Sequence, residues 1–319
     1  MIRYLGARLA QAVGVLWATF TVTFVLLYVL PQDPIVTMLG ARGDSSSLDP
    51  AQMAELRQVF GFDQPVPLQY LTRLAAALRG DFGLSVQTRQ PVLHEIAQAL
   101  PHTLALAGLA LALALTAGVV IATAASYATR PWLRQVLFAL PPLGVALPTF
   151  WVGLTLSQWF SFRWRLLPAF GTDGFRSLIL PALTLAVPVS ASLAQVLSQS
   201  LIATWRAPHI GLARSKGARR WHVLTHHVFR NSLGPALAVL GLTVGNVLAG
   251  SVVTETIFAR PGLGRLVQLA VTEQDIPVVQ GVAVFAAAVF VVVNLVVDLV
   301  QFVVTPQLAR PGAARPVRP

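Results

Sequence analysis

Long apolar runs without charge alternate with short polar segments along this chain. Six runs contain no Asp, Glu, Lys or Arg, and they cover residues 9–32, 103–129, 135–162, 177–205, 231–254 and 276–297. A helix needs about 20 apolar residues to cross a bilayer, and a helix satisfies its own backbone hydrogen bonds in lipid. The pattern therefore predicts an all-α polytopic membrane protein with six transmembrane helices.

The composition supports a membrane solvent. Apolar residues make up 55% of the chain, charged residues 11%, and the mean hydropathy is +0.68, whereas soluble proteins carry roughly 25% charged residues. Long buried helices of a soluble protein would need polar faces, which these runs lack. The chain has no cysteine, which excludes disulfides, thiolate metal sites and thiol catalysis.

The first run raises the alternative of a secretory signal peptide. It follows Arg3 and Arg8, as a signal would, but it is longer than a typical signal core of 7–15 residues and lacks a small-x-small cleavage site. We therefore expect a retained helix whose N-terminus is cytoplasmic.

Charge placement predicts the orientation. With six crossings, the cytoplasmic parts are residues 1–8, 130–134, 206–230 and the tail after 305. These parts hold thirteen Arg or Lys residues and no Asp or Glu, while the opposite side holds ten basic and eleven acidic residues. This asymmetry follows the positive-inside rule and places both termini in the cytoplasm. It also accounts for the net charge of +11 without nucleic-acid binding.

The runs divide the chain into four parts. These are an N-terminal transmembrane helix (1–31), an external helical subdomain (32–101), a transmembrane core (102–305) and a cytoplasmic tail (306–319). Turn residues in the subdomain predict short helices at 51–60, 68–78 and 91–100, the last of them leading into the membrane. The subdomain could be a structural cap or a docking surface, and its residues leave both open.

Two further features concern the membrane core. Proline residues permit bends in its spans, at Pro141, Pro142, Pro148, Pro181 and Pro188. Pro261-Gly262 interrupts the third external segment, which suggests a re-entrant hairpin lining a cavity, followed by a helix at 266–271.

No catalytic constellation is evident. His226 and His227 are adjacent and would point about 100° apart on a helix, so we predict no metal site. Ionisable residues within the spans would indicate an ion pathway, but Glu255 and Asp298 both lie at helix ends. An ion-driven secondary transporter and an intramembrane enzyme therefore stay as alternatives with little support.

The 206–230 segment is the densest basic region. It is long enough for two short helices joined at Gly217. We expect Arg219 and Arg220 to face water or a partner, and Trp221, Val223, Leu224 and Val228 to form an apolar surface. The alternative is a solvated loop whose charge only sets topology, but that alternative needs neither the tryptophan nor the central glycine.

This segment resembles the signature loop of binding-protein-dependent ABC importer permeases. Ala213 and Gly217 match the Glu-Ala-Ala-x-x-x-Gly pattern, whereas Gly211 and Leu212 depart from it. The dipeptide/oligopeptide/nickel branch is matched more closely by Ala213-Arg214-Ser215-Lys216-Gly217, His227-Val228-Phe229-Arg230-Asn231 and Pro235. Further similar patches lie at 31–34, 62–65, 80–83, 148–151, 180–183, 255–264 and 275–280, so the resemblance covers nearly the whole chain. Thr305-Pro306-Gln307 departs from the Asp-Pro-Arg common after the last helix.

The resemblance implies a non-catalytic subunit of an ATP-driven importer in a bacterial cytoplasmic membrane. Its partners would be a second homologous permease, two cytosolic ATPases that bind ATP and Mg, and an extracytoplasmic solute-binding protein; the chain itself would hold no cofactor. The external insert suggests the first permease of the pair. Substrates of this branch include dipeptides, oligopeptides, glutathione, nickel and metallophore complexes, and the sequence leaves the choice open.

The resemblance also implies two groups of functional residues. The coupling helix that contacts an ATPase would lie in 206–230, and its residues are Ala213, Arg214, Lys216, Gly217, Arg219, Arg220, Trp221, His227, Arg230 and Asn231. The third external segment would supply an outer gate or a binding-protein contact, through Glu255, Phe258, Pro261, Gly262, Gly264 and Asp275.

Overall fold

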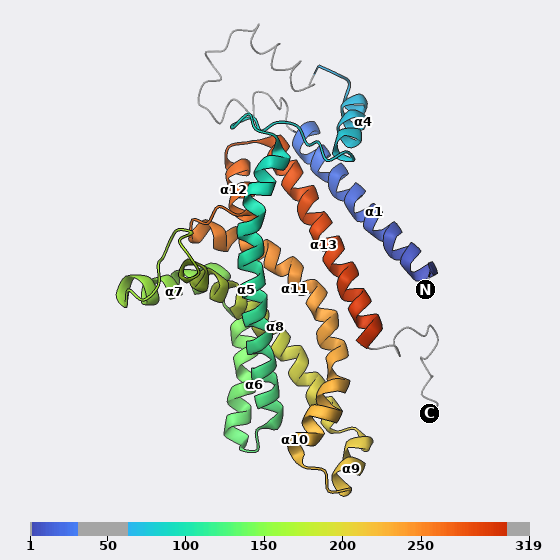
Figure 1. The fold of residues 1–319 in the computed structure, drawn as a ribbon, viewed down its shortest axis with the longest axis vertical. Helices are drawn as coiled ribbons and strands as arrows, with labels where there is room; N and C mark the ends of the chain where they lie inside the picture. Colours follow the sequence, from blue (N-terminus) through green and yellow to red (C-terminus); the bar gives the residue numbers. More distant parts are fainter. Residues whose placement is uncertain (1, 31–62, 305–319) are drawn as a thin grey trace. The chain divides into compact units, whose positions relative to one another are not determined.

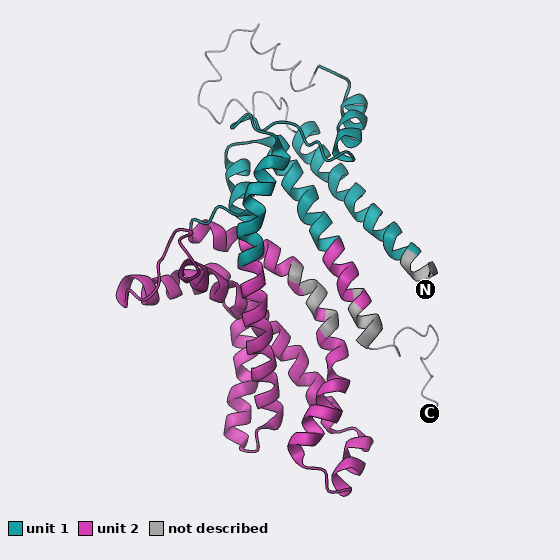
Figure 2. Cartoon of the chain, viewed as in Figure 1, with its two compact units in different colours: residues 1–105, 259–291 teal, residues 106–258, 292–319 magenta. Residues whose placement is uncertain are grey.

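The computed structural model describes residues 2–30 and 63–304 (Figure 1). The chain forms two compact units, one of residues 1–105 and 259–291 and the other of residues 106–258 and 292–319 (Figure 2). The described residues are mainly helical, and the isolated bridge between Leu84 and Pro91 is their one β-type pairing. The predicted helix at 51–60 and the tail at 306–319 lie outside the described residues.

In the first unit, a short helix docks against the N-terminal helix. Helix α1 (Ile2–Phe24) continues into the π-helical turn η1 (Val25–Val29), and α4 (Val66–Ala77) packs on both. Phe20, Phe24 and Tyr28 form an aromatic cluster with Tyr70 of α4. The Tyr70 hydroxyl also pairs with Thr21 Oγ1 at 2.8 Å. The helix predicted at 68–78 is therefore confirmed, with each boundary slightly earlier.

The second core of this unit joins α5 (Val92–Tyr127), α12 (Leu263–Thr272) and α13 (Ile276–Val304). Val92, Ile96 and Ala99 of α5 pack with apolar residues of α12 and α13, namely Leu263, Ala270, Val278 and Val282. A Cβ added at Gly281 would lie 2.5 Å from Val92 Cγ1, so glycine is what permits this approach of α13 to α5.

The other unit is built around α8 (Arg176–Trp205), which packs against α6 (Pro131–Ala146), α7 (Thr149–Leu156) and α11 (Arg230–Ile257). Its remaining elements are η2 (Ser157–Arg163), α9 (Pro208–Ser215), α10 (Arg220–His222) and η3 (Val223–Phe229). Small residues allow close packing here too, because a Cβ at Gly144 of α6 would lie 2.7 Å from the Ala191 Cβ of α8.

Four helical stretches in the described residues are long and apolar enough to cross a membrane, at Gly6–Val29, Val92–Tyr127, Arg176–Trp205 and Ile276–Val297. A bent pair, Pro131–Ala146 and Thr149–Arg163, would make a fifth. The fifth apolar run of the sequence forms the continuous 28-residue helix α11.

Two expected elements differ in the structure. The run at 135–162 is two helices that meet at 102°, because Leu147 and Pro148 are extended. The bend falls where Pro148 was expected to permit one. The helix predicted at 91–100 is confirmed, but it does not end at residue 100. It is the first part of the 36-residue helix α5, which continues through Pro101.

Candidate functional site

A glycine cap separates the two helical parts of the 206–230 segment. Gly217 has φ +82, its N–H donates to the Arg214 carbonyl at 3.0 Å, and the Ala218 N–H donates to the Ala213 carbonyl at 3.3 Å. These two bonds form the Schellman motif that ends a helix at a left-handed residue. The predicted junction at Gly217 is confirmed, and the Ala213–Gly217 spacing is the spacing of this helix cap.

The segment is anchored by buried apolar side chains. Ile210, Val223, Leu224 and Val228 are at most 1% exposed, and they pack with a row of leucines on α8, Leu193, Leu197 and Leu201. The expectation that Val223, Leu224 and Val228 form an apolar surface is therefore wrong. These residues lie on the face of η3 that covers α8.

Aromatic contacts fix the start of the second helical part. The Arg220 guanidinium lies 4.6 Å from the Tyr127 ring centroid and 5.8 Å from that of Trp205. Trp221 packs edge-on against Tyr127 at 6.0 Å but keeps 59% of its surface exposed. Arg220 thus holds the segment to the ends of α5 and α8 through cation–π contacts, whereas the sequence suggested that it faces water or a partner.

The other predicted coupling residues lie mostly on the surface. Arg214, Lys216, Gly217, Arg219, Arg230 and Asn231 are exposed, and Ala213 and His227 are half-buried. The Asn231 side chain donates to the His227 carbonyl at 2.8 Å, which is a bond within the helix. Leu212 is 60% exposed beside these residues. In the sequence, Leu212 stands out only as a departure from the family pattern. An exposed apolar residue in a basic stretch can also indicate a contact surface.

The predicted gate residues divide between the two units. Glu255 in the last turn of α11 and Phe258, its C-cap, belong to the second unit, and each is 1% exposed. In the first unit, Gly262 and Gly264 are buried at the start of α12, where the Leu263 N–H donates to Thr103 Oγ1 at 2.8 Å. Helix α12 begins three residues before the predicted 266–271, because the Thr103 hydroxyl accepts a hydrogen bond from a backbone N–H of its first turn.

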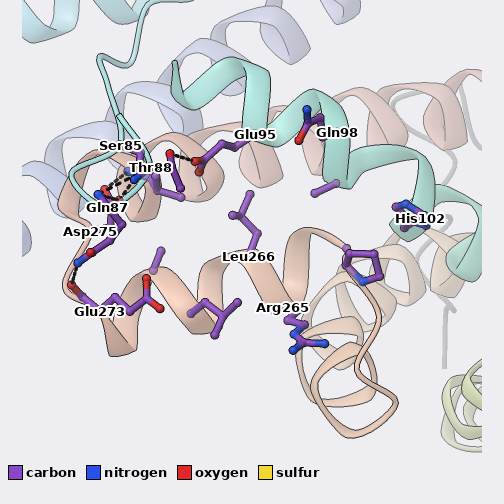
Figure 3. A pocket seen from close by; sticks show the side chains of 16 residues that line it. Ser85, Gln87, Thr88, Glu95, Gln98, His102, Arg265, Leu266, Glu273 and Asp275 are labelled. Atoms are coloured by element: carbon purple, nitrogen blue, oxygen red, sulfur yellow. Dashed lines mark hydrogen bonds between the residues drawn. The ribbon is translucent and has the colours of Figure 1, made fainter. Parts of the chain in front are cut away.

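A cavity of about 660 Å³ lies within the first unit, between α5, α12 and the loop at 85–88 (Figure 3). Pro261, Gly262 and Asp275 of the predicted gate line it, which confirms that the Pro-Gly segment borders a cavity. Its other polar lining residues were not singled out from the sequence, and they are Ser85, Gln87, Thr88, Glu95, Gln98, His102, Arg265 and Glu273. They come from segments some 170 positions apart, so no local motif marks them.

Asp275 ties the two sides of this cavity together. Its Oδ2 accepts from the Ser85 hydroxyl at 2.5 Å and from the Gln87 N–H at 3.2 Å, and its Oδ1 accepts from the Val278 N–H at 3.4 Å. The Gln87 side chain donates to the Glu273 carbonyl at 2.9 Å. Asp275 is only 2% exposed, so it caps α13 and fixes the 85–88 loop. In the described part of the chain, no group of three or more His, Cys, Asp or Glu could hold a metal ion.

Comparison with known proteins identifies the family of this chain. The family described as binding-protein-dependent transport system inner membrane component matches residues 114–310, and the N-terminal part of such components matches residues 1–107. The chain belongs to this family. It is an ABC importer permease of the peptide type and a multi-pass protein of the inner membrane.

Named relatives cover nearly the full length of the permease. One is a peptide transport system permease protein of Brucella suis biovar 1 (strain 1330), 36% identical over 94% of this chain and 97% of the relative. Another is the glutathione transport system permease protein GsiC of Salmonella choleraesuis (strain SC-B67), 32% identical over 97% of this chain and 99% of the relative.

A solved structure shares the fold. It is an amino acid ABC transporter crystallised with histidines, with a TM-score of 0.50 and 17% identity over 67% of this chain and 94% of that one. At this identity the likeness concerns the fold alone.

Proposed function

We propose that this permease is the membrane subunit through which short peptides enter the cell, with import driven by ATP hydrolysis on two partner ATPases. It would pair with a second homologous permease as the first of the two, and receive substrate from an extracytoplasmic binding protein. The six apolar runs would be six spans, with both termini and the 206–230 segment cytoplasmic. ATP and Mg would bind to the ATPases, and this chain would hold no cofactor.

The observation that carries the coupling role is that the 206–230 segment has one exposed side and one buried side. One side exposes Leu212, Arg214, Lys216 and Arg219, which offer an apolar contact and cationic hydrogen-bond donors. The other side is the buried anchor of Ile210, Val223, Leu224 and Val228 on α8. A movement of an ATPase bound to the exposed side would therefore move α8 with it, because packed cores shift as rigid bodies.

Transport is tested with the assembled complex in proteoliposomes. We expect the complex to take up radiolabelled tri-alanine only when ATP is present on the side of the membrane that carries the ATPases. The permease alone should show no uptake under a proton or sodium gradient. Ion-driven uptake by the permease alone would overturn the proposal in favour of a secondary transporter. A parallel assay with nickel-63, free or chelated, tests the alternative cargo of the same family branch, and saturable nickel uptake without peptide uptake would replace peptides as substrate.

Coupling is tested by charge reversal. The double variant Arg214→Glu/Lys216→Glu should lose most ATPase binding while the permease still inserts in the membrane. Arg130→Glu is the matched control, since Arg130 is exposed before α6 and outside the segment. Wild-type ATPase binding by the double variant would refute the docking surface.

A further inference from the structure

We infer that the cavity of the first unit is a binding site for a short zwitterionic peptide, held by its two charged ends. In this site Glu95 and Glu273 bind the terminal ammonium and Arg265 binds the terminal carboxylate. The inference rests on the proposed peptide import and adds a substrate site within this chain.

The carboxylates of Glu95 and Glu273 and the guanidinium of Arg265 lie at opposite ends of the cavity. Glu95 on α5 and Glu273 at the end of α12 lie at one end, and Arg265 and His102 lie at the other, with Leu266 between (Figure 3). The Glu95 carboxylate accepts a hydrogen bond from the Thr88 hydroxyl, which orients it and leaves lone pairs for a ligand. The Asp275 carboxylate is engaged by Ser85 and Gln87 and serves to hold the loop.

The spacing of these polar groups fits a peptide of three or four residues. Arg265 and Glu273 are eight positions apart along α12, which corresponds to about 12 Å at ~1.5 Å per residue. Glu95 and His102 are seven positions apart on α5, about 10 Å. An extended peptide spans about 3.3–3.6 Å per residue, so three or four residues bridge the acidic and basic ends.

The middle of the cavity suits a peptide of varied sequence. Ala99, Leu266, Leu269 and Val278 provide apolar walls, and the Gln98 amide lies beside them. Side chains can therefore be accommodated by apolar contact, while an amide can bond to the peptide backbone. The volume of about 660 Å³ lies within the usual range for small-ligand sites, ~300–1,000 Å³.

The dipole of α12 reinforces the same orientation. Arg265 lies in the first turn of α12 and Glu273 follows its last residue, so the positive end of the helix dipole coincides with the basic end of the cavity. A carboxylate is favoured at that end and an ammonium at the other.

The excess of carboxylates disfavours ligands with additional negative charge. Glu95, Glu273 and Asp275 line the cavity against one guanidinium, that of Arg265. Glutathione carries two carboxylates and one ammonium, so it should bind more weakly than a neutral tripeptide of similar length. The site therefore discriminates between the two substrate classes named among the relatives.

The test is equilibrium binding to the purified, assembled transporter in the absence of the binding protein. Radiolabelled tri-alanine should bind saturably, and N-acetylated tri-alanine and tri-alanine amide should each bind about tenfold more weakly, the loss of one charged contact. Glutathione should also bind more weakly than tri-alanine, and alanine peptides should bind best at three or four residues. Equal affinity of the wild-type complex for free and capped peptides would overturn the site without requiring any variant to fold.

Single substitutions test which end of the cavity binds the ammonium and which binds the carboxylate of the peptide. Glu273→Gln should weaken tri-alanine about tenfold but leave the N-acetyl peptide unchanged, and Arg265→Gln should weaken tri-alanine but not its amide. Arg79→Gln is the matched control, because Arg79 is exposed and outside the cavity lining.

If both cavity variants bind tri-alanine as wild type does while ATP-driven uptake persists, this site is refuted and the proposed function stands. If wild type shows no ATP-driven peptide uptake, the proposed function fails, and with it the physiological meaning of the site.

Discussion

The Asp275 carboxylate accepts a 2.5 Å hydrogen bond from the Ser85 hydroxyl across 190 positions of sequence. The same carboxylate caps the first turn of α13 through the Val278 N–H. One buried side chain therefore holds both the loop before α5 and the start of the last helix, and it does so next to the cavity.

Replacing Asp275 by Asn should lower stability. The carboxylate accepts hydrogen bonds on both oxygens, and an amide offers only one acceptor, so at least one buried donor is left unpaired at a cost of about 1–3 kcal/mol. We expect a lower midpoint of thermal unfolding, followed by the fluorescence of the seven tryptophans. Asp81→Asn is the control, because exposed Asp81 accepts a single bond from the Gly83 N–H. An equal effect of both substitutions would contradict the role assigned to Asp275.

Replacing Gly281 by Ala should strain the contact between α13 and α5. The added Cβ would lie 2.5 Å from Val92 Cγ1, and such overpacking costs about 1–3 kcal/mol. The second substitution Val92→Ala removes the clashing methyl groups, so the double variant should unfold at a higher temperature than additivity of the single variants predicts. Gly14→Ala, with no atom within 4 Å of the new Cβ, should be close to neutral. Additive effects at 281 and 92 would show that the two helices do not meet there.

Replacing Gly217 should uncouple ATP hydrolysis from transport in proportion to backbone strain. The position has φ +82 and no neighbouring atom within 4 Å, so the cost arises from the left-handed backbone and not from a clash. Val should cost more than Asn, since a β-branched residue avoids this conformation and Asn tolerates it. We expect the ATP consumed per peptide imported to rise in the order Gly, Asn, Val. The same ratio in all three would mean that the cap plays no part in coupling.

Arg220 and Arg219 should behave differently although they are adjacent. Arg220→Gln removes the cation–π contact with Tyr127, worth about 0.5–1 kcal/mol, so amides at 219–222 should exchange with solvent faster. Arg219→Gln should leave exchange unchanged but weaken ATPase binding, because Arg219 is exposed. Hydrogen exchange measured by mass spectrometry on the purified permease distinguishes the two, and matching exchange in both variants would contradict the assignment.

Residues with a strong local meaning were predictable from the sequence. Gly217 marks a helix junction because few other residues accept its backbone conformation, and Pro148 marks a bend because proline breaks a helix. The apolar runs follow from composition alone, since lipid demands helices of a fixed length.

Features that depend on tertiary packing were not predictable. Val223, Leu224 and Val228 lie in a basic stretch and suggested a surface, but the leucines of α8 that bury them are more than 20 residues away. The helix predicted at 91–100 extends much further, because α5 continues through Pro101. The cavity joins Glu95 to Arg265 and Glu273, and no pattern in one sequence links positions so far apart.

The helix cap at Gly217 and the apolar side chains that anchor the 206–230 segment on α8 together have an engineering consequence. Both are internal to the permease. Under the proposed coupling role, the glycine would therefore secure the shape of the 206–230 segment and carry no information about which ATPase docks. Recognition would then depend on exposed positions such as Leu212, Arg214 and Lys216, and these are the positions to exchange when the permease is to be paired with a different ATPase.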